Sequence, residues 1–322
     1  MMMKSILHSR THILSYTSPH SALSQTSILS LSTVYMASTL TAMKARLEKG
    51  DTLYGLFLCT FSPVIAEISG YAGYDFVVVD MEHGYGGIST ALPCLHALAA
   101  TATPAILRLP ECSQTWAKKA LDLGPQGVMF PMIDTPEQAR RAVSYCRYPP
   151  NGLRGAAHPV IRASRYGIDE EYLSKCETDL FVMCQVESME GVRNVREIAA
   201  VDGVDCIQIG PLDLSASMGE LWDPVNEKVK SMMNGLEEAV IGLRPNRGDG
   251  VSGPYLAGFA MANDGPNELR VRGYHMVAGG VDIGLYRAAA VDDVKKFKMG
   301  LNLDAEIEGT TEVSSFVKIG SK

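Results

Sequence analysis

The sequence has few features of a secreted, nucleic-acid-binding or membrane-spanning protein. Its seven cysteines include no CxxC pair, and Cys59, Cys184 and Cys206 fall inside apolar runs, as reduced core cysteines do. Lysine and arginine form no run, and a formal net charge of −7 disfavours attraction to nucleic acid or to an anionic membrane. No apolar stretch approaches the ~20 residues that span a bilayer. We therefore expect a reduced, cytoplasmic protein without disulfides.

Acidic residues are missing from the start of the chain, where the first one is Glu48 and Ser and Thr are abundant. A mitochondrial transit peptide has such a composition, although it is usually richer in Arg. We favour the alternative, a disordered or over-extended start, with the working protein beginning at Met36. A mitochondrial location stays open if residues 1–35 are translated. Residues 1–47 are therefore predicted to be an extension outside the fold.

A Gly-rich phosphate loop is also missing after the first β-rich run, which disfavours a doubly wound open sheet. The chain instead alternates short apolar runs with helical stretches over about 240 residues, the usual size of a (β/α)8 barrel. Most of the runs are continuously apolar, as parallel strands buried on both faces are. We therefore predict an α/β fold, a TIM barrel over residues 48–300, followed by a polar C-terminal tail over 301–322.

The predicted elements follow one another regularly along the chain. The predicted strands are 53–59, 76–80, 104–109, 127–132, 180–187, 204–210, 255–261 and 274–280. The predicted helices are 63–72, 88–100, 114–123, 136–146, 168–176, 190–200 and 225–241.

Polar and ionisable side chains concentrate where the predicted strands end, although the strand interiors are almost wholly apolar. In a barrel of this kind, the carboxyl ends of the strands build the active site. A charge buried without a partner is costly, so these groups should pair with one another, with a metal or with a ligand. They are Asp80, Glu82, His83, Arg108, Gln185, Glu187 and Asp213.

Glu187 and Asp213 follow neighbouring strands, so their carboxylates would converge and repel one another unless a cation or a proton lay between them. Oxygen ligands with room for waters suit Mg2+, Mn2+ or Co2+ better than a structural zinc. The alternative is that each carboxylate caps a helix or pairs with an arginine. Gln185 points to the same side of its strand as Glu187, where it would orient waters on the metal or satisfy a core amide.

His83, near Asp80, is a reasonable general base at neutral pH, although a lone histidine is more often structural. Arg108 would be unusual in an apolar strand, but it suits an anionic substrate or a developing enolate oxygen. The GPLD loop (210–213) can present N–H groups to a carboxylate, which is a weak signal alone. Between Asp51 and Ala290 all lysines lie in predicted helical segments; they are Lys118, Lys119, Lys175, Lys228 and Lys230. They disfavour a Schiff-base mechanism and favour a metal that polarises the carbonyl.

Several short strings follow one another in a fixed order along the predicted barrel. They are AGYDFVVVDMEHG (72–84), LRLP (107–110), LDLGPQGVMFPM (121–132), RYPPNGLRG (147–155), RASRYG (162–167), CQVES (184–188) and IGPLDLSASMG (209–219). No single string would suffice, but together they resemble the HpcH/HpaI aldolase family from about Thr52 to Val291. The resemblance implies a phosphoenolpyruvate/pyruvate-type barrel that forms or cleaves 4-hydroxy-2-oxo acids from an aldehyde and the enolate of pyruvate. It also implies oxaloacetate decarboxylation as a side activity.

The resemblance also implies roles for the site residues. Glu187 and Asp213 match the metal ligands and Gln185 the amide beside them. Arg108 matches the arginine that stabilises the enolate oxygen. Asp122, in LDLG, matches an aspartate that reaches into a neighbouring subunit's site, which implies a homo-oligomer, typically a hexamer.

Two further groups are implied in the same way. His83, with Asp80 beside it, matches the histidine that works in proton transfer with a metal-bound water. The second group is a loop that matches the one holding the substrate carboxylate in the family. It consists of Gly210, Pro211, Leu212 and Asp213.

Three features depart from the family pattern. Met81 replaces a small residue, and Phe57 stands where tryptophan is expected in relatives, which would alter the wall of the substrate pocket. The segment 241–254 is longer and richer in Gly and Arg than in similar proteins. It is either a loop that determines specificity or an artefact of gene modelling. The aldehyde partner, the physiological direction and the preferred metal therefore stay open.

Three alternatives use the same kind of barrel. A lyase for citryl-CoA or malyl-CoA thioesters would need a nucleotide-binding surface, for which the sequence has no clear signal. A macrophomate-synthase-like enzyme would start from oxaloacetate with the same chemistry. A non-catalytic metal-binding barrel is disfavoured, because the candidate catalytic and metal-binding residues are all present.

Overall fold

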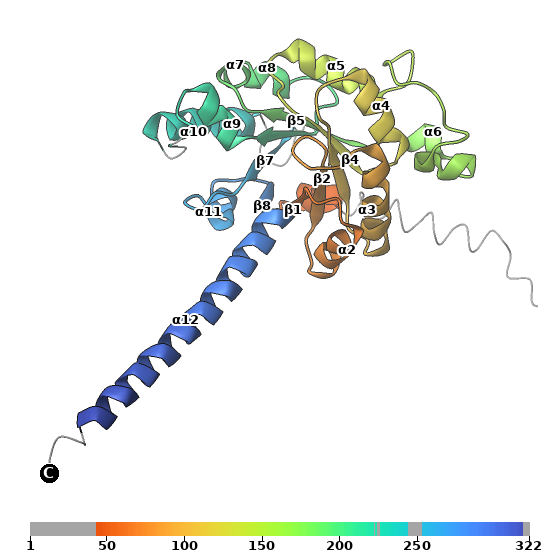
Figure 1. Ribbon diagram of the computed structural model, residues 1–322. Helices are drawn as coiled ribbons and strands as arrows, with labels where there is room; N and C mark the ends of the chain where they lie inside the picture. The colour runs from red at the N-terminus through yellow and green to blue at the C-terminus, as the bar shows by residue number, and fades with distance from the viewer. Residues whose placement is uncertain (1–42, 222, 224–225, 244–252, 318–322) are drawn as a thin grey trace, which may run out of the picture.

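Eight parallel strands pair in sequence order and close into a barrel (Figure 1). The computed structural model describes residues 43–221, 223, 226–243 and 253–317, so most of the predicted extension and most of the segment 241–254 lie outside the described residues. The strands are β1 (Leu53–Leu58), β2 (Phe76–Asp80), β3 (Ala105–Arg108), β4 (Gly127–Phe130), β5 (Phe181–Val186), β6 (Cys206–Ile209), β7 (Tyr255–Phe259) and β8 (Met276–Val281). Each predicted strand overlaps one of these, and the (β/α)8 prediction is confirmed.

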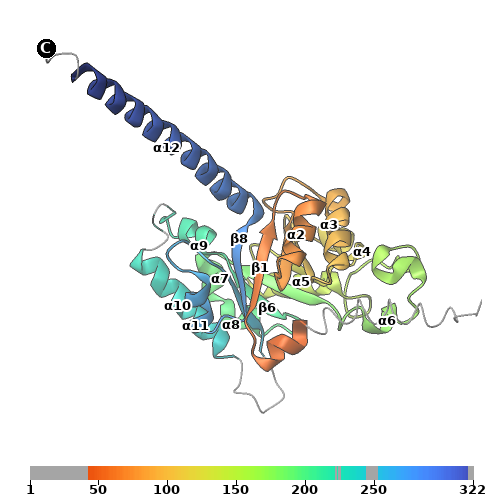
Figure 2. The ribbon, with the colours of Figure 1, turned by 90° about the horizontal axis from the view of Figure 1, so that it is seen from below.

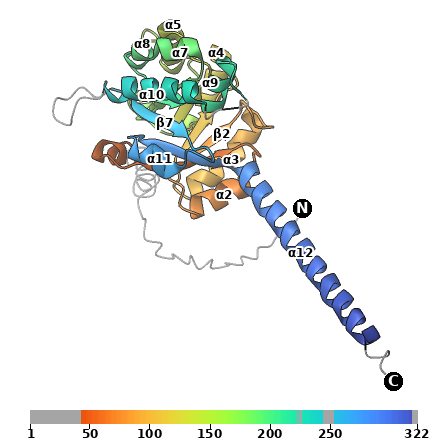
Figure 3. The same ribbon diagram turned by 90° about the vertical axis from the view of Figure 1, so that its left-hand side faces the viewer.

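Helices surround the strands, and several of them begin after a residue whose side chain caps the helix (Figures 1 and 3). Ser62, Ser113 and Thr135 each accept a hydrogen bond from a backbone N–H in the first turn of the helix that follows. The α-helices are α2 (Pro63–Tyr71), α3 (Ile88–Ala100), α4 (Gln114–Asp122), α5 (Pro136–Cys146), α6 (Tyr172–Lys175), α7 (Met189–Arg193), α8 (Val195–Ala199), α9 (Pro211–Ser217), α10 (Glu227–Ile241), α11 (Pro266–Val271) and α12 (Asp282–Val317).

Three of the predicted helices differ in the structure. The prediction over 168–176 shortens to α6 and is preceded by a 3-10 segment, Arg162–Gly167. The prediction over 190–200 divides into α7 and α8 at Asn194, whose backbone is not helical. The predicted 225–241 helix begins slightly later, as α10.

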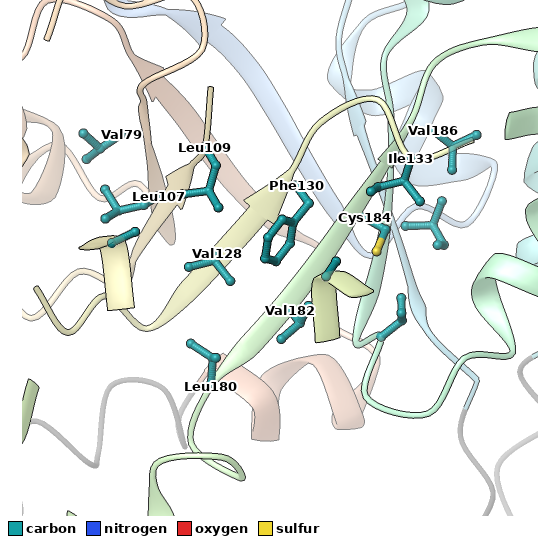
Figure 4. Close-up of a cluster of buried hydrophobic side chains, with 14 of the residues drawn as sticks. Val79, Leu107, Leu109, Val128, Phe130, Ile133, Leu180, Val182, Cys184 and Val186 are labelled. Carbon is teal, nitrogen blue, oxygen red and sulfur yellow. The ribbon is translucent and has the colours of Figure 1, made fainter. Parts of the chain in front are cut away.

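Side chains alternate between the two faces of each strand and divide the core into two layers. Val78, Ile106, Met129 and Met183 point inward and pack in the barrel interior. The outer layer packs between the strands and the helices, with Phe130 among the side chains labelled in Figure 4. The interior is therefore a packed core and not a channel.

The amino end of the barrel is closed by the helical segment 43–49. Met43 and Leu47 on this segment are buried in the same cluster as the inward-facing Leu53 and Phe181. The closure leaves the opposite end, where the strands finish, as the place where polar side chains can meet a ligand.

The last helix, α12, runs for 36 residues and extends away from the barrel (Figures 1 and 2). The backbone stays helical to Val317, through most of the predicted polar tail over 301–322. In the described part of the chain, no helix is long and apolar enough to cross a membrane.

Candidate active site at the carboxyl end of the barrel

Arg108 and Asp80 form a buried ion pair at the ends of β3 and β2. The two residues are direct partners in the strand register, so both side chains point inward above the apolar interior. Arg108 donates from Nε to Oδ1 of Asp80 at 2.8 Å and from Nη2 to Oδ2 at 2.5 Å. Burial alone would raise the pKa of Asp80, but the paired guanidinium holds it below its usual value. The pair is therefore charged on both sides at neutral pH.

Three more side chains surround the guanidinium of Arg108. Oε2 of Glu82 lies 2.9 Å from Nη1, and Oε1 of Gln185 accepts a long hydrogen bond from the same nitrogen at 3.4 Å. The ring of Phe57 lies beneath the guanidinium, with 4.9 Å between Cζ and the ring centroid. Phe57 in turn meets Phe259 of β7 edge-on. The guanidinium is thus fixed in one orientation by contacts from the ends of three other strands, β1, β2 and β5.

Glu187 lies at the end of β5 and is only 1% exposed. Its Oε1 accepts the backbone N–H of Met132 at 2.9 Å, and its Oε2 accepts a hydrogen bond from the amide of Gln185. Burial raises the pKa of Glu187 to about 7, and the charges of Glu82 and Asp213 add to the shift. Burial likewise raises the pKa of Glu82 to about 7, with contributions from two neighbouring aspartates.

These raised pKa values predict how stability depends on pH in the absence of metal. Glu82 and Glu187 titrate near 4.5 when exposed, so the folded protein binds more protons than the unfolded chain between about pH 4.5 and about pH 7. The free energy of unfolding, measured by urea titration in chelator, should therefore fall as pH rises through this window. The Glu187→Gln variant should show a shallower fall. An equal fall in variant and wild type would contradict this origin of the pH dependence.

The acidic side of the site suits a divalent cation. Oε2 of Glu82 is buried and, apart from its ion pair with Arg108, has no hydrogen-bond partner among the described residues. The negative charge of Asp213 contributes to the raised pKa values of both Glu82 and Glu187. A Cβ atom added at Gly210 would lie 2.3 Å from Oε2 of Glu187, so the space beside this carboxylate exists because residue 210 is glycine. Carboxylate oxygens are ligands that Mg2+ and Mn2+ prefer.

A cation here would need waters or substrate atoms to complete its coordination. In the described ranges, no group of three or more His, Cys, Asp or Glu side chains is arranged to hold a metal ion. Asp213 is exposed on the first turn of α9, facing solvent more than Glu187 does. The residues therefore fit an open site with two protein ligands, of the kind that binds substrate directly.

The loop that begins with Gly210 has few N–H groups to offer a carboxylate. The N–H of Gly210 already donates to the carbonyl of Val186 at 3.3 Å, and Pro211 has no N–H. Leu212 and Asp213 are in the first turn of α9, where backbone N–H groups have no partner within the helix. Of the four residues predicted for this role, the last two are thus the available donors.

Two predicted residues lie away from the Arg108–Glu187 cluster. His83 is exposed at the rim, where its backbone N–H donates to Oδ1 of Asp80 at 3.3 Å and its ring makes no hydrogen bond within the described residues. Asp122 ends α4, just before β4 begins, so it lies at the opposite end of the barrel from Arg108. Oδ1 of Asp122 is buried without a hydrogen bond to any described residue, and burial raises the pKa of Asp122.

The sequence reasoning missed several members of the site. Cys59 follows β1 and donates from Sγ to Oδ2 of Asp80 at 3.3 Å, although the sequence indicated only a core cysteine. Glu82 was noticed as a strand-end group, but its contact with Arg108 was not expected. Phe259 is the inward residue at the end of β7. Cys59 could have been found by counting in twos from Phe57, because that period places both side chains on the inner face.

Comparisons with known proteins agree on one family. The family described as HpcH/HpaI aldolase/citrate lyase matches residues 53–289. The chain is 36% identical over 260 residues to a hydroxypyruvate/pyruvate aldolase from Chromohalobacter salexigens, covering 79% of this chain and 96% of that protein. It is 38% identical over 259 residues to a 2-keto-3-deoxy-L-rhamnonate aldolase from Escherichia coli K12, covering 80% and 94%.

A solved structure shows the same relationship. An HpcH/HpaI aldolase/citrate lyase family protein from Burkholderia cenocepacia superposes with a TM-score of 0.73 at 33% identity. The match covers 80% of this chain and 99% of that one.

Proposed function

We propose that this chain, which belongs to the HpcH/HpaI aldolase/citrate lyase family, is a metal-dependent aldolase. Its reaction would proceed through the enolate of a 2-oxo acid such as pyruvate. It is an enzyme of the carbon–carbon lyase class. The observation that carries the proposal is the buried Arg108–Asp80 pair at the carboxyl end of the barrel, which the amide of Gln185 links to the carboxylate of Glu187. The guanidinium of Arg108 can stabilise an enolate oxygen, and the carboxylates beside it can bind a metal ion that contacts the same oxygen.

Arg108 would stabilise the oxygen on which negative charge develops. Asp80 and Glu82 hold its guanidinium from one side, so its donors are oriented before the substrate binds. Such preorganised donors are a main source of electrostatic catalysis. The N–H groups of Leu212 and Asp213 would bind the substrate carboxylate. His83, at the rim, would take up or return the proton of the methyl group.

Glu187 and Asp213 would hold a divalent cation, with Gln185 and Glu82 orienting its waters. When bound, Mg2+, Mn2+ or Co2+ would polarise the carbonyl group and make the neighbouring C–H more acidic. Loss of CO2 from oxaloacetate gives the same enolate, so we propose this decarboxylation as a side activity. The names of the two aldolase relatives support a 2-oxo acid as substrate and leave the aldehyde open.

Cleavage assays test the proposal against the thioester alternative. A panel of 4-hydroxy-2-oxo acids, with Mn2+ or Mg2+ present, should release pyruvate, which a coupled reduction to lactate detects. Citryl-CoA and malyl-CoA should not be turned over. Cleavage of a CoA thioester without cleavage of any hydroxy-oxo acid would replace the aldolase proposal by the thioester lyase.

We further propose that the enzyme is a homo-oligomer, in which Asp122 completes a neighbour's site and α12 packs on a second copy. α2 packs against β1 and α11 against β8, and α12 extends away from both, so no described helix covers the surface between them (Figure 2). Tyr54, on the outer face of β1, is 39% exposed there, although the outward-facing Val77 and Val79 of β2 are fully buried. A missing helix explains this exposure.

The uncovered surface and α12 are complementary. Val64, Ile68 and Tyr71 form one exposed apolar face of α2 at spacings of four and three residues. Tyr286, Val294 and Phe297 likewise fall on one exposed face of α12. The second copy would offer the same two surfaces in return, as a two-fold symmetric contact requires.

The double substitution Val294→Asp with Phe297→Asp should therefore shift the protein to a smaller assembly in sedimentation velocity. Two carboxylates would be desolvated in an apolar contact, which costs several kcal/mol in total. Activity should fall with it, because Asp122 no longer reaches a neighbour. A pair on the opposite face with the same change in net charge, Ala288→Asp with Lys295→Gln, should leave the assembly unchanged. The same mass for both variants and the wild type would rule out this contact.

A further inference from the structure

Asp282, the first residue of α12, joins the start of this helix to the end of β1. Its side chain is only 6% exposed. Oδ1 accepts the backbone N–H groups of Cys59 at 2.9 Å and of Ile283 at 2.8 Å, and Oδ2 accepts the N–H of Thr60 at 3.0 Å and its hydroxyl group. Only one of these donors belongs to α12. The carboxylate therefore does more than cap its own helix: it fixes the backbone at Cys59.

Cys59 connects this carboxylate to the candidate active site. Its Sγ donates to Oδ2 of Asp80 at 3.3 Å, and the same oxygen accepts from Nη2 of Arg108 at 2.5 Å. Burial, followed by the charge of Asp80, raises the pKa of the Cys59 thiol to about 12. The sulfur therefore keeps its proton at neutral pH, and it acts as a hydrogen-bond donor and not as a nucleophile.

Asp80 is thus held from three directions. Arg108 donates two hydrogen bonds from β3, and the backbone N–H groups of Glu82 and His83 donate to Oδ1 at 3.0 and 3.3 Å. The contact from Cys59 is the one that comes from β1. Without the thiol of Cys59, Oδ2 of Asp80 would keep its hydrogen bond from Arg108 but would lose its contact with the segment that follows β1.

We propose that Cys59 and Asp282 are positioning residues for the reaction, which hold Asp80, and through it Arg108, in the orientation that the enolate oxygen requires. This inference rests on the proposed function. Their hydrogen bonds go to Asp80 and to the backbone at residues 59, 60 and 283, so each should act on the rate of the chemical step and not on the affinity for the 2-oxo acid or for the metal. A misaligned Arg108 still neutralises Asp80, but its donors no longer meet the oxygen at the right angle.

The test compares Cys59→Ala, Cys59→Ser and Asp282→Asn in the full-length enzyme loaded with Mn2+. Cys59→Ala should lower kcat for cleavage of a 4-hydroxy-2-oxo acid by about tenfold, the cost of one hydrogen bond to a charged group, with KM and Mn2+ affinity unchanged. Cys59→Ser keeps a donor and should recover most of the loss. Cys94→Ala removes another buried thiol, on α3, and should have the activity of the wild type.

A double-mutant cycle separates positioning from a general loss of stability. If Asp282 acts through Cys59, the variant with both Cys59→Ala and Asp282→Asn should be no slower than the worse single variant. Independent effects that multiply, or single variants that lose thermal stability with wild-type kcat, would overturn the inference. A wild-type enzyme that cleaves no hydroxy-oxo acid would instead count against the proposed function, which keeps the two failures distinguishable.

Discussion

Glu187→Gln is expected to lose bound divalent metal and at least about a hundredfold in kcat, because an amide oxygen is a neutral and weaker ligand than a carboxylate. The substitution keeps the volume of the side chain. In the variant, the amide oxygen can still accept the backbone N–H of Met132. The new NH2 group would then face the side-chain amide of Gln185, which in the wild type donates to Oε2 of Glu187. Metal content after dialysis and turnover at saturating Mn2+ measure the two losses.

The control for this prediction is Glu190→Gln. Glu190 is an exposed acid on α7, three residues further along the chain, and its loss changes the net charge by the same amount. It should keep wild-type metal content and activity. If Glu187→Gln also retains wild-type metal content, the assignment of Glu187 as a ligand is wrong.

Arg108→Lys is expected to lower kcat by about a hundredfold to a thousandfold while metal binding persists, as for the removal of a preorganised donor to a developing anion. A lysine ammonium keeps the positive charge beside Asp80. It cannot hold Asp80 through two parallel hydrogen bonds and still reach Glu82, as the planar guanidinium does. The loss therefore reports geometry more than charge.

Two measurements make this interpretation specific. Mn2+ affinity should stay within a few-fold of the wild type, and thermal unfolding should show a folded protein, since one cation remains to pair with the buried carboxylate. Arg140→Lys provides the matched control, because Arg140 is an exposed arginine on α5 that forms an ion pair with Glu137 on its own helix. An Arg108→Lys enzyme with wild-type kcat would remove Arg108 from the mechanism.

The barrel could be predicted because its strands are buried on both faces. Continuous apolar runs such as FVVVD (76–80), each followed by a helix with a recognisable start, give both the strand positions and their parallel order. Three helices were missed: α9 and α11 have only seven and six residues, too few to show a helical periodicity, and α12 was not predicted. The direction of α12 could not be predicted either, because the residues of α12 do not specify which surface this helix packs against.

The candidate site could be predicted only as far as the strand ends determine it. Which residues lie at the mouth follows from the positions of the strands, and the structure does bring Arg108, Asp80, Gln185 and Glu187 together. Contacts between side chains of neighbouring strands depend on register and rotamer, which the sequence does not specify. The thiol of Cys59 on Asp80 is such a contact.

The most direct test of the account is the exchange of pyruvate methyl protons with deuterated water, followed by NMR. It requires the enolate and no aldehyde, so it tests the chemistry without knowledge of the second substrate. We predict exchange with Mn2+ or Mg2+, none in chelator, and exchange slowed by about a hundredfold or more in Arg108→Lys. Exchange that persists in chelator, or that is unchanged in the variant, would contradict a metal-assisted enolate stabilised by Arg108.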